Sequence, residues 1–208
     1  AGERDERRKE ADATLRDPAL ELLAKARGAR MDSPLYAEAL VAELQGDFDR
    51  AIALAGEAAE SAPWLYEART ALGRAFRLRG LERMNAGRDG EALADFDEAG
   101  KAFRKAIDVA RSDPDAYQGM CSVWRDRIDF AQVRRRSAGD ALAEAAEWCG
   151  KAVAVDPANA LTLLRASDVE VTAFEPYCIP KGRDAVDKAL SLATARELLA
   201  RVAEGRRW

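Results

Sequence analysis

Small residues recur at helical spacing along the chain, and the clearest case lies between Gly46 and Pro63. Within this stretch Ala51, Ala55 and Ala58 are separated by four and three positions, so in a helix they share one face. A face of small residues allows a second helix to approach closely. Proline lacks a backbone N–H and restricts the residue before it, so the predicted helix ends just before Pro63.

The same spacing returns twice, which indicates a repeat. Equivalent helices carry Ala92, Phe96, Ala99 and then Ala145, Cys149, Ala152. Start signals of the type Ser-Pro or Asp-Pro precede helices at residues 33–34 and 113–114. The pattern predicts a charged helix and helical cap over residues 1–31, followed by an array over 32–208 with units at about 32–65, 66–113, 114–157 and 158–208.

The second unit is longer than the first. Its first helix runs 14 positions from Gly73 to the turn at Gly87, whereas the matching distance from Ala39 to Gly46 is seven. The second helix is also extended, so we expect each helix of this pair to have gained one heptad, about two turns. Paired insertions keep antiparallel contacts in register.

Both ends of the chain depart from the pattern. Residues 3–16 predict a highly charged helix, and Asp17 before Pro18 is expected to cap a new one. After a helix to about Phe174, prolines interrupt residues 174–182, which favours a loop. Residues 183–204 predict a final helix that closes the stack with a polar outer face.

Paired helices repeating at roughly 34 residues are the tetratricopeptide (TPR) period. The chain resembles this family over residues 32–193 through Gly46, Phe48, Ala51, Ala55, Ala58, Pro63, Leu72, Gly73, Phe76, Gly87, Ala92, Phe96, Ala99, Met120, Trp124, Ala145, Ala152 and Pro157. The resemblance implies an all-α solenoid of stacked antiparallel helix pairs, with two lengthened hairpins and a C-terminal capping helix. The longer units and the proline-rich break depart from the family.

In this family the first helix of each pair lines a concave groove that holds extended peptides or partner helices. The resemblance therefore implies a non-enzymatic scaffold with a protein or peptide partner. One alternative is a regulatory segment of a larger signalling protein, such as a bacterial serine/threonine kinase. The other is a self-assembly adaptor.

Composition excludes several function classes. The net charge is −4, which disfavours nucleic-acid binding. There is no histidine, so the commonest general base and metal ligand are missing, and no glycine-rich phosphate loop occurs. We expect no catalysis, no metal and no cofactor. No apolar run is long enough to span a membrane.

The compartment stays open, with the cytoplasm slightly favoured unless a larger parent is membrane-anchored. The chain begins with Ala1 rather than methionine, as a processed or excised segment would. Its cysteines, Cys121, Cys149 and Cys178, are too few for a disulfide framework. They are either buried small residues or include one bridge, Cys121–Cys149 or Cys149–Cys178.

Polar residues on the predicted first helices are the candidate ligand contacts. They are Glu67, Thr70, Arg74, Arg77, Gln118, Ser122, Arg125, Thr162 and Arg165. Arginines along a groove can hold carboxylates by paired hydrogen bonds. Alternatively these residues form an ordinary solvated face, with nearby Glu67, Asp115 and Asp126 offsetting the charge. The run Arg134–Arg136 is either a solvated helix end or a dock for an acidic surface.

Overall fold

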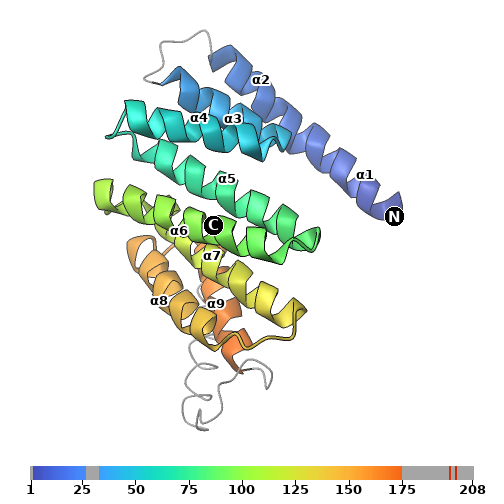
Figure 1. Cartoon of the computed structure of the whole chain (residues 1–208), viewed down its shortest axis with the longest axis vertical. Helices are drawn as coiled ribbons and strands as arrows, with labels where there is room; N and C mark the ends of the chain where they lie inside the picture. Colours follow the sequence, from blue (N-terminus) through green and yellow to red (C-terminus); the bar gives the residue numbers. More distant parts are fainter. Residues whose placement is uncertain (1, 27–32, 175–196, 198–199, 201–208) are drawn as a thin grey trace.

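The computed structural model describes residues 2–26, 33–174, 197 and 200, and every element in these ranges is helical (Figure 1). The elements are α1 (Gly2–Ala11), η1 (Asp12–Arg16), α2 (Asp17–Ala26), α3 (Pro34–Gln45), α4 (Phe48–Ser61), α5 (Tyr66–Asn85), α6 (Asp89–Val109), α7 (Pro114–Val133), α8 (Gly139–Val155) and α9 (Ala160–Phe174). The all-α prediction is confirmed.

Consecutive helices pack as pairs, α3 with α4, α5 with α6 and α7 with α8, and α9 packs on α8 and α7. The stretch from Gly46 to Pro63 folds as predicted. Gly46 has a φ of 78°, a left-handed conformation that glycine adopts without strain. Asp47 then caps α4 by accepting a hydrogen bond from the backbone N–H of Arg50.

Helix lengths confirm the expected insertion. α5 and α6 have 20 and 21 residues, whereas α3 and α4 have 12 and 14. Each helix of the second pair is therefore about two turns longer than its counterpart, so the added turns face one another.

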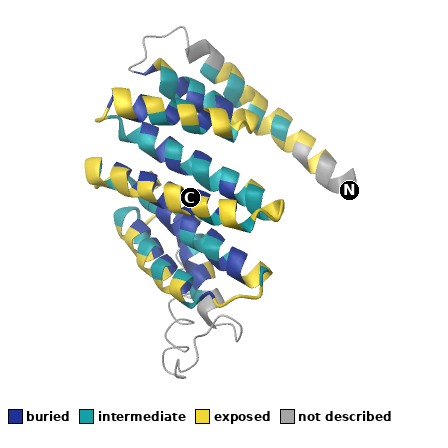
Figure 2. Cartoon of the chain, viewed as in Figure 1, coloured by how far each residue is buried: buried dark blue, intermediate teal, exposed yellow. Residues whose placement is uncertain are grey.

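The core consists of several apolar clusters between successive helices. Buried alanines line the contacts between α3, α4 and α5, including Ala39, Ala55 and Ala71. Larger side chains fill the space between the second and third pairs, where Phe96 and Phe103 are fully buried. In Figure 2 the buried residues lie between helices, and the exposed ones cover the outer sides of α4, α6 and α8.

The prediction for the N-terminal segment is wrong in one respect. Asp17 does not cap a new helix, because its own backbone is helical and its N–H donates to the carbonyl of Asp12. Residues 2–26 are helical without interruption, with a wider π-type turn at Asp12–Arg16. A turn of this kind lets a helix continue past Pro18, which cannot donate the usual bond.

Three sequence predictions lie outside the described residues. These are the loop that follows Phe174, the final helix at 183–204 apart from residues 197 and 200, and the pairing of Cys178. Among the residues that are described, no helix combines the length and hydropathy that a membrane span requires.

Candidate functional site

The stack has an inner face formed by the first helices of each pair. α3 contacts α5, α5 contacts α7 and α7 contacts α9, whereas α4, α6 and α8 make no comparable contacts with one another in the described ranges. Helices that lie closer together mark the inside of a curve. The first helices therefore form the concave side, and the second helices form the convex side.

Arginines on this inner face join one helix to the next. Ion pairs with nitrogen–oxygen distances of 2.5 to 3.4 Å connect α3, α5, α7 and α9. Arg74 makes three such contacts with Glu43, Arg77 makes two with Asp126, and Arg125 makes one with Asp168. We call this row the arginine ladder. Arg77 and Arg125 are each the twelfth residue of their helices, so the two rungs sit at equivalent positions.

Burial and charge compete within the ladder. Burial raises the pKa of the Asp126 carboxyl, and this outweighs the opposite influence of Arg77. Burial also raises the pKa of Asp129, which lies near Arg125. For Arg74 and Arg125, burial disfavours the charged form, but hydrogen bonds to their carboxylate partners raise the pKa.

Arg165 on α9 differs from the other three arginines. It is half-buried, and no carboxylate among the described residues lies within ion-pair distance of it. Burial and the positive charge of Arg77 lower its pKa and, together with Arg125, outweigh the opposite influence of Asp126. Arg165 is thus a desolvated cation next to the arginine ladder, and it has no carboxylate partner among the described residues.

The predicted hydroxyl contacts do not lie on the exposed surface. Thr70, Ser122 and Thr162 are all buried. The hydroxyls of Thr70 and Ser122 donate to the carbonyls of Tyr66 and Gln118, one turn earlier in their helices. Their role as ligand contacts stays a prediction, made for residues that are buried in the described structure.

Glu67 and Gln118 are half-buried and remain candidates together with the arginines. The carboxylates that complete the ladder, Glu43 and Asp168, were not predicted from the sequence. Only the fold brings them opposite arginines that lie 31 and 43 positions away.

Two further contacts fix the third pair. A disulfide joins Cys121 of α7 to Cys149 of α8, which decides between the alternatives for these two cysteines. Arg134 donates to both carboxylate oxygens of Asp89 and to the carbonyl of Met84. The first arginine of the run 134–136 is therefore docked on the α5–α6 turn instead of being solvated.

Metal chemistry finds no support in the described part of the chain, where no group of three potential ligands comes together. No family model matches the sequence. No curated protein matches it either.

Solved structures of similar shape do exist. The MamA RS-1 ArsTM double mutant superposes with a TM-score of 0.56 at 18% identity, over 98% of this chain and 92% of that one. MamA 41-end from Desulfovibrio magneticus RS-1 gives 0.55 at 18%, over 98% and 93%. A crystal structure of MamA gives 0.52 at 17%, over 96% of each chain.

The fold is a TPR superhelix. The stacked pairs, the buried alanine face and the glycine turns are those that the sequence pattern predicted. At identities this low, the similarity shows the fold alone.

Proposed function

We propose that this chain is a non-enzymatic scaffold that holds a peptide or partner helix against its inner face, with a carboxylate of the partner bound to Arg165. The observation that carries the proposal is the unpaired, half-buried state of this arginine in the described structure. A desolvated guanidinium is stabilised by an anion more strongly than an exposed one, because water screens the attraction less.

The arginine ladder supports the proposal that Arg165 is the residue that binds the partner's carboxylate. Arg74, Arg77 and Arg125 already hold carboxylates of the chain itself. They stiffen the inner face and are poorly placed to release their partners for a ligand. Arg165 can accept a carboxylate without breaking an existing ion pair, so binding there costs less.

The test is a selection from a random peptide display library on the immobilised chain. We expect the enriched peptides to share an acidic residue or a free C-terminal carboxylate. Their affinity should fall at least tenfold on Arg165→Gln, since a hydrogen bond to a charged group contributes about 1.5 to 3 kcal/mol.

Arg111→Gln is the matched control, because this arginine is exposed in the α6–α7 connection, away from the inner face. Its loss should leave the affinity unchanged. Peptides that bind wild type and Arg165→Gln equally well would overturn the proposed carboxylate contact.

A further inference from the structure

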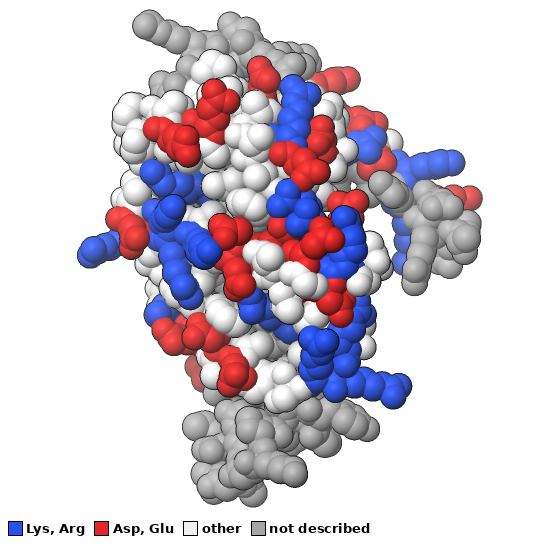
Figure 3. Space-filling model, viewed as in Figure 1, with Lys and Arg blue, Asp and Glu red and all other residues white. Residues whose placement is uncertain are grey.

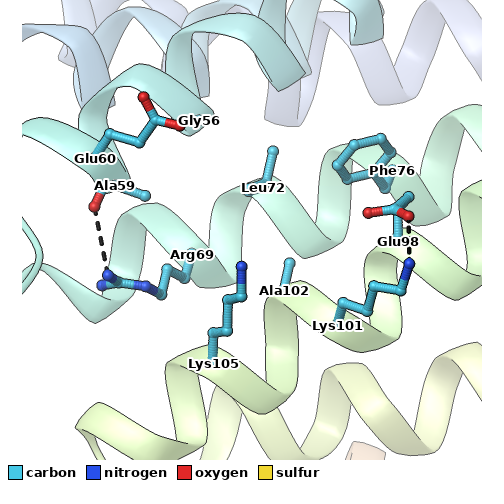
Figure 4. A pocket seen from close by; sticks show the side chains of 10 residues that line it. All are labelled: Gly56, Ala59, Glu60, Arg69, Leu72, Phe76, Glu98, Lys101, Ala102 and Lys105. Carbon is cyan, nitrogen blue, oxygen red and sulfur yellow. Dashed lines mark hydrogen bonds and ion pairs between the residues drawn. The ribbon is translucent and has the colours of Figure 1, made fainter.

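A cleft opens on the convex side, opposite the inner face. The second helices α4 and α6 diverge there, and α5 forms the floor between them (Figure 4). The cleft has a volume of about 210 Å³. Its apolar surface comes from Ala59, Leu72, Phe76 and Ala102.

Gly56 of α4 widens the cleft. A Cβ atom added at this glycine would meet no other atom within 4 Å. The space is thus open where a side chain would otherwise project. Its volume exceeds the roughly 150 Å³ of an apolar cavity that holds benzene, so one large side chain of a ligand fits.

The rim of the cleft carries three cations, Arg69, Lys101 and Lys105, against two carboxylates, Glu60 and Glu98. Basic side chains also gather over the adjoining ends of α5 and α6 at the left of Figure 3. The whole chain has a net charge of −4, so this local excess of positive charge runs against the overall balance.

The three cations are not equally free. Arg69 donates to the carbonyls of Pro63 and Ala59, and Lys101 pairs with Glu98 at 2.7 Å. Lys105 has no ion-pair partner among the described residues, and Figure 4 shows its amine extending over the cleft towards Leu72.

We propose that this cleft binds an acidic segment of another protein, with one apolar side chain on the Leu72–Phe76 floor and flanking carboxylates at Lys105 and the rim. Charge complementarity selects this occupant. A basic partner would meet the Lys105 amine that extends over the cleft, and a purely ionic partner would leave the apolar floor exposed to water. This second surface is independent of Arg165 and lets the chain contact two partners at once.

The probe is an acetylated, amidated pentapeptide, Glu-Glu-Leu-Glu-Glu, titrated into the full chain and followed by backbone amide chemical shifts. We expect saturable shifts on α4, α5 and α6. Replacing the leucine of the peptide by glycine, or every glutamate by lysine, should weaken binding at least tenfold.

Two variants test the cleft from opposite sides. Gly56→Leu places a side chain in the cleft from a position whose Cβ meets no atom within 4 Å, and Lys105→Glu reverses the charge of the amine that extends over the cleft. Each variant should lower the affinity for the pentapeptide at least tenfold. Lys9→Glu makes the same charge change on the exposed side of α1 and should have no effect.

Arg165→Gln should also leave the pentapeptide affinity unchanged, which separates this inference from the proposed function. The inference is overturned if both cleft variants bind as wild type does, or if the shifts lie on α7 and α9. It is equally overturned if the lysine peptide binds as tightly, or if the cleft binds a ten-nucleotide single-stranded DNA in place of the acidic peptide.

Discussion

At the scale of single residues, Phe103 shows why certain helical positions must be glycine. Its fully buried ring lies on Gly73 of α5 and Gly119 of α7. A Cβ at Gly73 would come within 2.8 Å of the ring, and one at Gly119 would come closer still. Glycine inside a helix is normally unfavourable, so these two are retained for close approach. A Cβ at Gly56 would project into open space, so close packing does not require glycine at that position.

Alanine substitutions at two helical glycines should therefore have opposite effects on stability. We expect Gly119→Ala to lower the free energy of unfolding by about 2 to 3 kcal/mol, because the methyl group overpacks against a ring that cannot move away. Gly56→Ala should raise it by about 0.5 to 1 kcal/mol through helix propensity. Urea denaturation followed by circular dichroism measures both. Changes of the same sign would contradict this account of the packing.

At the scale of elements, the α7–α8 pair is held by more than apolar contacts. The Cys121–Cys149 bridge lies within the cluster formed by α7, α8 and α9. The residue after α7, Arg134, anchors this end of the pair to Asp89. The bridge closes a chain segment with a sequence separation of 28, so it restricts the unfolded chain.

Loss of the bridge should lower the free energy of unfolding by about 3.5 kcal/mol, from the loop-closure entropy of a segment of this length. The comparison is wild type against the Cys121→Ala, Cys149→Ala double variant, each with and without dithiothreitol, by thermal denaturation. Reduced wild type should approach the double variant, whose midpoint should not respond to the reductant. If complete reduction leaves the thermal midpoint of the wild type unchanged, the bridge does not stabilise the folded chain.

At the scale of the whole molecule, the stack has two sides with different properties. On the inner face the first helices touch and are tied by the arginine ladder, whereas on the convex side the second helices diverge and leave a cleft. Each repeat contacts mainly its neighbours, so the stability of the array depends on the interfaces between successive pairs. The Arg77–Asp126 rung crosses one of these interfaces and is its most buried ion pair, with side-chain exposures of 19% and 4%.

Removing Arg77 should make the stability of the array depend on pH. Burial already raises the pKa of Asp126 above its ordinary value of 3.8, and loss of the arginine raises it further. The folded chain then binds a proton that the unfolded chain releases, so stability falls as the pH rises through that window. We expect Arg77→Met to cost about 3 kcal/mol at pH 7.5 and clearly less at pH 5.

Urea denaturation at the two pH values measures this difference. Arg111→Gln, which leaves Asp126 paired, should show no comparable dependence on pH. An equal loss for Arg77→Met at pH 5 and pH 7.5 would show that Asp126 does not take up a proton in the folded variant.

Within residues 33–174, the sequence by itself determined the helices, their pairing and the added turns of the second pair. These follow from local rules: proline and glycine end helices, and small residues at spacings of three and four mark the packed face. The positions of Gly46, Ala55 and Pro63 were enough to place α4.

Only the tertiary structure decided what the polar residues do. Asp126 and Asp168 meet their arginines across helix interfaces, and Thr70 and Ser122 turn into the stack. Spacing along one helix fixes which face a residue occupies, but the curvature of the stack decides what lies opposite that face. Both Arg165, which has no ion pair among the described residues, and the cleft beside Lys105 depend on that curvature, because it draws the first helices together and spreads the second helices apart.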